Sequence, residues 1–395
     1  MPSRRHLLLA GAVAPFASLA VGALAAPAAT GSPRFAFVIL RGGLDGLTAV
    51  PAIGDPAFAE ARGALANFSA FGSPPLKLDP TFALHPLLPQ LHSMYGQGEL
   101  AVLHAVGLPY RERSHFDAQQ LLESGGTRPY EYSTGWIGRA LPGSQLRAVA
   151  LETAVPLVLR GGSEVDTWAP SVLPEPSADL VARLELVYRN DPLLAQALAR
   201  ARGLRAEAGM ATNPQNTAGH AGGGRGAVVA LARKAADFLQ RGSQVAVLEI
   251  GGWDSHANQA APNGATSNNL RTLDAALAAL REGLLPGDTW RRTVVLVATE
   301  FGREVAVNGT QGTDHGSGGA AFVLGGAVKG GRVIADWPGL AKKERFEGRD
   351  LGITTDLRGA MRSVLADHLR VPRSLLDNSV LPGSAALPAL DLLRG

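Results

Sequence analysis

The chain has no cysteine, which excludes disulfides, thiolate metal ligands and a cysteine nucleophile. It also lacks a charge excess, because 37 Lys and Arg stand against 34 Asp and Glu in 395 residues, a net charge of +3. So small a surplus provides no basic patch, and we expect no nucleic-acid partner. Charged residues make up 18% and apolar residues 46% of the chain. This balance excludes a disordered protein and predicts a globular one with a large core.

The N-terminus carries one long apolar run. Arg4 and Arg5 precede an apolar stretch from Leu7 to about Ala25, which ends in small residues. This pattern is typical of a twin-arginine export signal, and the glycines and proline within the stretch disfavour the alternative of a membrane anchor. We therefore predict a cleaved signal over residues 1–25 and a linker over 26–33. The mature chain would be periplasmic or secreted, exported by the twin-arginine machinery, with no stable membrane span.

Five short apolar runs are candidate strands, at residues 35–40, 100–106, 245–250, 293–299 and 320–326. Each is apolar along its length, as expected for strands that are buried on both faces of a mainly parallel sheet. Helical patterns alternate with them, at residues 85–96, 115–124, 177–203, 225–241, 267–284 and near 355–369. The order of elements predicts one α/β domain over residues 34–390, with helices on both faces of the sheet.

Polar residues follow these strands at the positions where an open parallel sheet binds its ligand, beyond the carboxyl ends of the strands. They are Asp45 in "RGGLDGL", Ser114, His115 and Asp117 in "RSHFDAQ", Asp254 and His256 in "GGWDSHANQ", Glu300 and Arg303 in "TEFGRE", and Asp314 and His315 in "GTDHGSGG". Taken alone, Asp45 before a glycine is a common turn residue. Ser114 with Asp117 equally fits a capping box that starts a helix.

The recurrence of carboxylates and imidazoles after successive strands favours a metal site. Both groups suit zinc, or manganese if oxygen ligands dominate, with one or two ions. In Asp254-x-His256 both side chains are able to turn to one ion. Asp314 and His315 supply either ligands or an acid and base that orient a substrate, and the surrounding glycines let the backbone approach an anion.

These motifs, together with the twin-arginine leader, resemble an exported bacterial family known as domain of unknown function 1501, over about residues 34–380. That family is similar in layout to the alkaline phosphatase superfamily, which includes sulfatases. The resemblance implies a three-layer fold of that type. It also implies that Asp45, Asp254, His256 and His315 contact metal, and that Ser114 is the nucleophile. Glu300 and Asp314 complete our predicted ligands, and His115 and Arg303 join Ser114 as catalytic candidates.

Two departures from the superfamily pattern keep the number of ions open. One residue, rather than three, separates Asp254 from His256, and Glu300 with Phe301 stands where an Asp-His pair is usual. Either Asp314 and His315 together replace the missing ligands, or only one metal ion is bound, or the site binds a ligand without catalysing a reaction. The leading interpretation is a metal-dependent hydrolase of phosphate or sulfate esters, acting on a small molecule or an envelope glycan. The alternatives are a non-catalytic periplasmic module that binds a polyanion or envelope glycan, and a purely structural envelope protein without metal.

Overall fold

The computed structural model describes residues 31–144, 146–170, 176–208 and 224–394. The predicted export signal over residues 1–25, and most of the predicted linker, lie outside the described residues. In the part of the chain that is described, no helix has both the length and the apolar character needed to cross a membrane.

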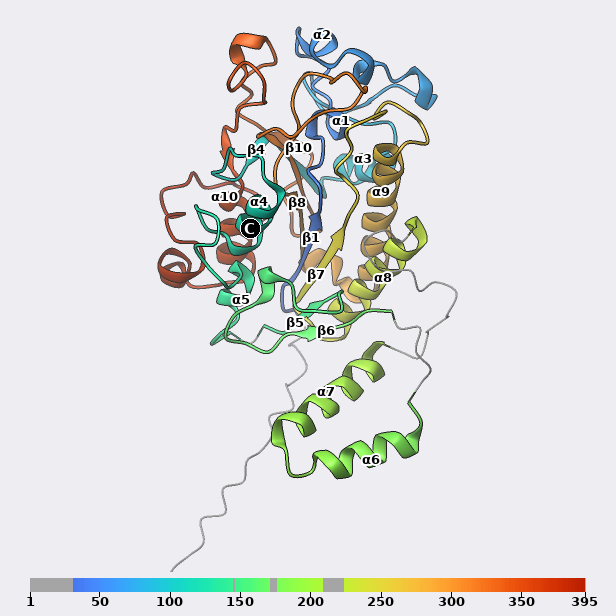
Figure 1. Ribbon diagram of the computed structural model, residues 1–395, viewed down its shortest axis with the longest axis vertical. Helices are drawn as coiled ribbons and strands as arrows, with labels where there is room; N and C mark the ends of the chain where they lie inside the picture. The colour runs from blue at the N-terminus through green and yellow to red at the C-terminus, as the bar shows by residue number, and fades with distance from the viewer. Residues whose placement is uncertain (1–30, 145, 171–175, 209–223, 395) are drawn as a thin grey trace, which may run out of the picture.

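A nine-stranded sheet forms the centre of the molecule (Figure 1). Its spatial order is β10-β4-β9-β8-β1-β7-β5-β6, and β11 also pairs with β4. The strands are β1 (Arg34–Leu40), β4 (Leu100–Gly107), β5 (Ala148–Ala150), β6 (Asp166–Thr167), β7 (Val245–Ile250), β8 (Thr293–Thr299), β9 (Gly319–Leu324), β10 (Arg332–Ile334) and β11 (Thr355–Asp356). A separate two-stranded sheet joins β2 (Leu76–Lys77) to β3 (Ala83–Leu84). All five predicted strands are confirmed.

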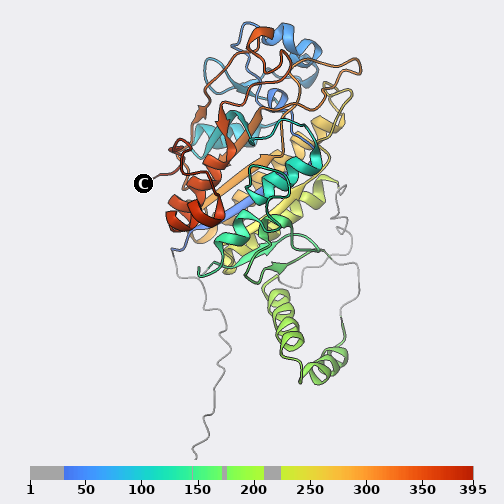
Figure 2. The same ribbon diagram turned by 60° about the vertical axis from the view of Figure 1, so that its left-hand side comes forward.

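Helices cover both faces of the sheet, so the predicted layered α/β class is confirmed (Figures 1 and 2). Alternate residues of β1 belong to two separate apolar clusters, as the two-residue period of a strand requires. One cluster includes residues of α3 (Pro89–Gly96), α8 (Arg225–Arg241) and α9 (Ala265–Leu284). The other includes residues of α4 (His115–Ser124), α5 (Trp136–Ala140) and α10 (Leu357–Ser363).

The helix predicted over residues 177–203 is instead two helices, α6 (Ala178–Tyr188) and α7 (Pro192–Ala208). Proline at 192 disfavours a helical backbone at the preceding residue, so α6 ends before it. Asp191 then starts the new helix, because its Oδ1 accepts hydrogen bonds from the amides of Leu193 and Leu194, both at 3.1 Å. The helix predicted near 355–369 begins at Leu357 and continues as a π-helical turn over Val364–His368.

The direction of β9 brings a late part of the chain to the site. Neighbouring strands pair in parallel except β9, which runs antiparallel to both β4 and β8. The segment 300–318 therefore leaves the carboxyl end of β8 and enters β9 at the same edge of the sheet. The ends of β1, β7 and β8 lie in register there, with Leu40 opposite both Ile250 and Thr299. Residues that are distant in sequence thus meet at one edge.

Candidate metal centre

Three loops at this edge supply the central side chains. His115 is the first residue of α4, which follows β4; Asp254 and His256 follow β7; His315 lies between β8 and β9. Backbone packs directly on backbone here, since a Cβ on Gly312 would lie 2.2 Å from the carbonyl carbon of His256. The glycines near Asp314 were expected to admit an anion, but Gly312 instead lets two loops pack closely enough to align their side chains.

The side-chain atoms of this cluster lie at ligand spacing. His315 Nε2 is 3.1 Å from His115 Nε2 and 3.2 Å from His256 Nε2. Asp254 Oδ1 is 2.9 Å from His256 Nε2 and 3.1 Å from His315 Nε2, and Asp254 Oδ2 is 3.4 Å from His115 Nε2. One ligand atom from each of His115, Asp254 and His315 falls within a common span of 4.8 Å. Tetrahedral zinc with bonds of 2.0–2.1 Å needs ligand atoms about 3.3 Å apart, and these spacings fit it.

The other ring nitrogen of each histidine faces an acceptor. His115 Nδ1 lies 2.8 Å from Glu300 Oε1, and His256 Nδ1 lies 3.0 Å from Asp314 Oδ1. His315 Nδ1 lies 3.1 Å from the carbonyl oxygen of Arg113. An acceptor at Nδ1 requires the proton there, so in the neutral ring Nε2 carries a lone pair. In that protonation state the three Nε2 lone pairs and the Asp254 carboxylate face one another, an arrangement that a further proton on an imidazole or a bound metal ion would stabilise.

The acids of the cluster are held ionised. Burial alone would raise the pKa of Asp254, but the charge of Arg303 and the hydrogen bond that Arg303 donates help to outweigh it and bring that pKa down to about 2. Burial also opposes ionisation of Glu300, yet hydrogen bonds from His115 and Gln119 lower its pKa. The hydrogen bond from His256 is the main reason that the pKa of Asp314 is lowered. The site therefore offers carboxylates in the form that binds metal.

Glu300 and Asp314 were predicted as ligands, but each lies at Nδ1 of a histidine, on the side of the ring that faces away from the Nε2 cluster. Glu300 is 1% exposed, and its Oε1 also accepts from the amide of Gly42 at 2.8 Å and from Gln119 Nε2 at 3.0 Å. Asp314 Oδ1 accepts from Asn308 Nδ2 at 3.2 Å besides facing His256. Acceptors of this kind fix the orientation of metal-binding histidines.

The hydrogen bonds of Asp45 go to residues outside this cluster, whereas the sequence-based prediction made it a metal ligand. It caps α1 (Gly46–Ala49) by accepting from the amide and the hydroxyl of Thr48, at 3.1 and 2.7 Å. Its other partner is the fully buried guanidinium of Arg62. Both carboxylate oxygens thus have partners within the fold, which favours a structural role for Asp45.

Arg303 also differs from its predicted role as an anion-binding group. Its side chain is fully buried. The guanidinium donates to the carbonyl oxygens of Gly43 at 2.9 Å and Trp253 at 3.0 Å, and to Asp254 Oδ1 at 2.8 Å. These bonds tie together the loops that follow β1, β7 and β8. Arg303 therefore positions Asp254, and its Nη1 also lies 3.4 Å from His256 Nε2.

Ser114 lies at the start of α4, directly before His115, but it does not cap the helix with its side chain. The capping box considered from the sequence is absent, because Asp117 accepts instead from the hydroxyl of Tyr110 at 3.1 Å. The first amides of α4 are therefore not bound by the Ser114 hydroxyl. A helix start of this kind is suited to an anionic group.

Several supporting residues were missed in the sequence. Gln119 lies one helical turn after His115 and reaches the same Glu300 oxygen, a spacing that the sequence displays. Asn308 bonds both Asp314 Oδ1 and the carbonyl oxygen of His256, at 3.2 and 3.1 Å, and no motif identified it. The carbonyl of Arg113 was beyond prediction, since any residue type provides one.

No curated protein matches the chain. Solved structures that resemble it include a 2-O GAG sulfatase, with a TM-score of 0.45, 11% identity, and coverage of 91% of this chain and 73% of that one. A putative sulfatase from Bacteroides thetaiotaomicron gives 0.44 and 10%, covering 91% and 74%. The phosphonate monoester hydrolase of Agrobacterium radiobacter gives 0.41 and 10%, covering 86% and 74%.

A family model covers the site itself. The model described as "Protein of unknown function (DUF1501)" matches residues 95–361, a range that includes every residue of the histidine cluster. This range is more than half of the 395 residues. The chain therefore belongs to the DUF1501 family of proteins of unknown function.

Proposed function

We propose that this protein is an exported metal-dependent hydrolase of phosphate or sulfate esters. The observation that supports the metal most directly is that His115, His256 and His315 all have an acceptor at Nδ1, which leaves three Nε2 lone pairs beside Asp254. Arg303 Nη1, which lies 3.4 Å from His256 Nε2, is able to donate to only one of these lone pairs, and a metal ion would engage all of them. Within the described residues, this is the one cluster where three or more suitable side chains meet. One ion therefore fits better than two.

The donor set favours zinc. Nitrogen ligands from imidazole with one carboxylate oxygen suit zinc, whereas manganese prefers oxygen. His115, Asp254 and His315 would hold the ion, and His256, whose Nε2 lies 2.9 Å from Asp254 Oδ1, is the fourth candidate. The side chains of Asp254 and His256 are 47% and 43% exposed. The site thus opens to solvent on one side, as catalytic zinc sites do.

Ser114 is the proposed nucleophile. It adjoins the ligand His115, and its hydroxyl makes no capping bond to α4. A bound divalent ion would lower the pKa of a nearby hydroxyl and offset the charge that develops on the ester. The amides at the start of α4 would bind the phosphoryl or sulfuryl oxygens in place of Arg303, which the fold engages elsewhere.

Two substitutions at Ser114 test this function. The mature protein, loaded with zinc or manganese, is assayed on aryl phosphates and aryl sulfates, and its metal content is measured by elemental analysis. We expect Ser114→Ala and Ser114→Asp to retain fold and metal and to lose turnover. Because Ser114 is not a side-chain cap, the Ala variant should cost less than the roughly 0.5 to 2 kcal/mol of a lost cap. Wild-type turnover by Ser114→Asp would instead make metal-bound water the attacking group.

A wild-type protein with metal but no turnover on either ester class would favour the non-catalytic module that binds a polyanion or envelope glycan. Absence of metal in protein purified without chelators would favour the structural envelope protein.

Export is part of the proposal and is tested separately. Replacing Arg4 and Arg5 by Lys should block export, and N-terminal sequencing of exported protein should begin near Ala26. A mature chain that begins at Met1 or Pro2 would contradict cleavage.

A further inference from the structure

Two of the candidate ligands lie beyond the part of the sheet that would fix their loops. The pairing of β4 with β9 ends at Val106 and Gly319, whereas His115 follows Val106 and His315 precedes Gly319. The hydrogen bonds between the two strands therefore do not set the distance between the two rings. Their Nε2 atoms are nevertheless 3.1 Å apart. This spacing depends on contacts between the loops themselves.

Asp350 is a buried carboxylate that both loops contact. Its Oδ2 atom accepts hydrogen bonds from Arg113 Nε and from Ser317 Oγ, both at 2.8 Å. Arg113 lies two residues before His115, and Ser317 lies two residues after His315. Asp350 is fully buried, so water does not compete for these bonds. One oxygen atom therefore connects the two loops that carry the histidines.

Asp350 is itself fixed in a short turn. Its backbone exchanges two hydrogen bonds with that of Phe346, at 2.9 and 3.0 Å, and its Oδ1 accepts from Arg349 Nη1 at 3.0 Å. The turn also packs on the loop between β8 and β9, because the amide of Gly318 donates to the carbonyl oxygen of Leu351 at 2.9 Å. Both oxygens of the carboxylate thus have partners that fix its orientation.

Arg113 connects this contact to the site through its backbone. Its φ of 58° lies in the left-handed region, which a residue other than glycine adopts where its surroundings hold it there. The carbonyl oxygen of Arg113 faces His315 Nδ1 at 3.1 Å, and Ser114 is the next residue. The contact with Asp350 therefore bears on the ring orientation of one candidate ligand and on the position of the proposed nucleophile.

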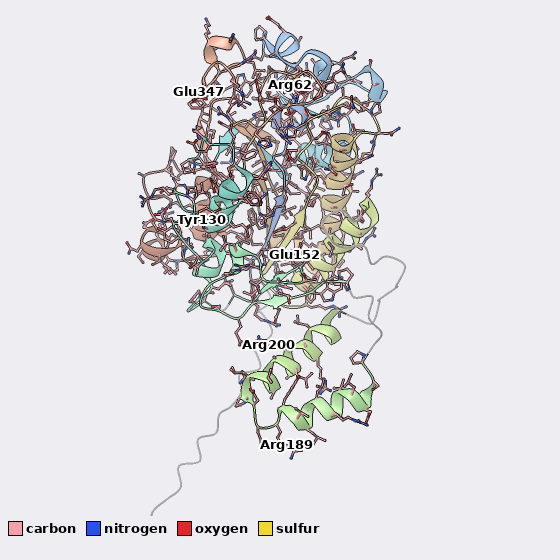
Figure 3. All side chains as sticks on the ribbon, viewed as in Figure 1. Arg62, Tyr130, Glu152, Arg189, Arg200 and Glu347 are labelled. Atoms are coloured by element: carbon pink, nitrogen blue, oxygen red, sulfur yellow. The ribbon has the colours of Figure 1, made fainter. Side chains whose placement is uncertain are left out.

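Of the two acids that bind Arg113, only Asp350 is buried. Glu347 accepts from Arg113 Nη2 at 2.7 Å, but its side chain is 59% exposed. Figure 3 shows Glu347 at the same end of the molecule as Arg62, which donates to the carbonyl oxygen of Val305 in the loop between β8 and β9. Because an exposed ion pair contributes little to stability, Asp350 is the partner that fixes the guanidinium.

We propose that Asp350 is a positioning residue, which holds the loops of His115 and His315 together so that their Nε2 atoms converge on one ion. The inference rests on the metal centre of the proposed function but not on ester hydrolysis. Asparagine at this position keeps the size of the side chain but replaces one carboxylate oxygen by an NH2 group. In either orientation of the amide, this group faces a donor, since both oxygens of Asp350 accept hydrogen bonds.

The first experiment measures the zinc affinity of the mature chain by competition titration. We expect Asp350→Asn to weaken zinc binding about tenfold, as the loss of a group that supports metal ligands does. Asp55→Asn is the matched control, because Asp55 Oδ2 also connects distant segments, accepting from Trp337 Nε1 at 2.8 Å and from the amide of Leu340 at 3.1 Å. None of these residues adjoins a candidate ligand, so the control should keep wild-type affinity. Unchanged affinity in Asp350→Asn, or an equal loss in the control, would overturn the proposal.

A double-mutant cycle tests the route through Arg113. Arg113→Gln removes the guanidinium and keeps the backbone carbonyl that faces His315. Asp350→Asn should therefore weaken zinc binding less in the Arg113→Gln background than in the wild type, and fully additive losses would refute this route.

Ser317→Ala provides a second test of the contact between the loops. It removes only one donor to Asp350 and leaves every charge paired, so it remains informative if Asp350→Asn does not fold. Circular dichroism verifies the fold of each variant. Ser317→Ala should also weaken zinc binding, by less than Asp350→Asn does, and wild-type affinity in this variant would contradict the proposed connection between the loops.

A measurement on metal-free protein separates this inference from the metal centre. Nitrogen NMR of the imidazole rings, at a pH where they are neutral, shows which nitrogen of His315 carries the proton. We expect Nδ1 in the wild type, where it faces the carbonyl oxygen of Arg113, and a mixture of both tautomers in Asp350→Asn. A wild type that binds no zinc would refute the metal centre, whereas the tautomer still reports whether Asp350 holds Arg113 against His315. An identical tautomer in Asp350→Asn and the wild type would show that it does not.

Discussion

Substitution of Asp45 by Asn separates a structural role from a metal-binding role at this position. Asn caps a helix as well as Asp does, so the bond to the amide of Thr48 is kept and the lost feature is the negative charge. Arg62 is then left as a fully buried cation without its counter-ion. Breaking a buried ion pair in this way costs about 3–5 kcal/mol. We expect a loss of that size in the free energy of unfolding, with metal content unchanged.

The assay is equilibrium unfolding in urea, with metal-saturated and chelator-treated protein measured in parallel. Arg62→Met should rescue much of the loss, because the double variant removes both charges from the interior. Asp237→Asn is the control, since Asp237 forms a half-exposed pair with Lys234 at 3.0 Å that is worth about 0–1 kcal/mol. If Asp45→Asn keeps its stability but loses metal, the placement of Asp45 with Arg62 is refuted and the original ligand prediction returns.

Three further predictions follow from the site and the core. When the free metal concentration before chelation is 100 times the dissociation constant, chelation should lower the free energy of unfolding of the wild type by about 2.7 kcal/mol. It should leave the melting temperature of His315→Ala nearly unchanged. Equal melting curves of the wild type with and without chelator would contradict the metal centre. Glu300→Gln should weaken zinc affinity by about 10- to 100-fold in competition titrations while Ser114→Ala leaves it unchanged, because Glu300 orients His115 without binding the ion itself; unaltered affinity would remove Glu300 from the support of the site. Burial lowers the pKa of His368 to about 4, so the native state holds its imidazole neutral, while the unfolded state takes up a proton below about pH 6.5. The free energy of unfolding should therefore fall as the pH drops from 6.5 towards 4, and in His368→Gln this fall should be shallower by about 1.4 kcal/mol per pH unit. Urea titrations measure both slopes, and identical slopes would contradict the prediction.

The strands could be predicted because they depend on local pattern. A strand buried on both faces needs apolar residues along its whole length, and "FAFVIL" and "TVVLVAT" show this without knowledge of their neighbours. The break between α6 and α7 was equally visible at Pro192 and was missed, because the apolar periodicity continues across it. The predicted signal over residues 1–25 remains a prediction.

The candidate site was predicted in position but only partly in detail. The sequence indicated that Asp254, His256 and His315 follow strands, and the shared edge of the sheet brings them together. It could not show which acids lie beside the Nε2 atoms of the histidines and which lie at Nδ1, because that choice depends on distances between loops. Glu300 and Asp314 were therefore counted as ligands, although both lie at Nδ1 of a histidine.

The sequence by itself determined the layered α/β class, the apolar strands and the set of acids and imidazoles available at one sheet edge, because these follow from residue type and periodicity along the chain. Only the tertiary structure decided their partners. Because β9 runs antiparallel to β8, His315 lies at the same edge of the sheet as the ends of the parallel strands. Asp45 forms an ion pair with Arg62. Arg303, predicted to bind an anion, is buried and connects loops by hydrogen bonds. Each of these outcomes depends on contacts between residues that are distant in sequence, and the energy of a buried charge or lone pair is set by what lies opposite it in space.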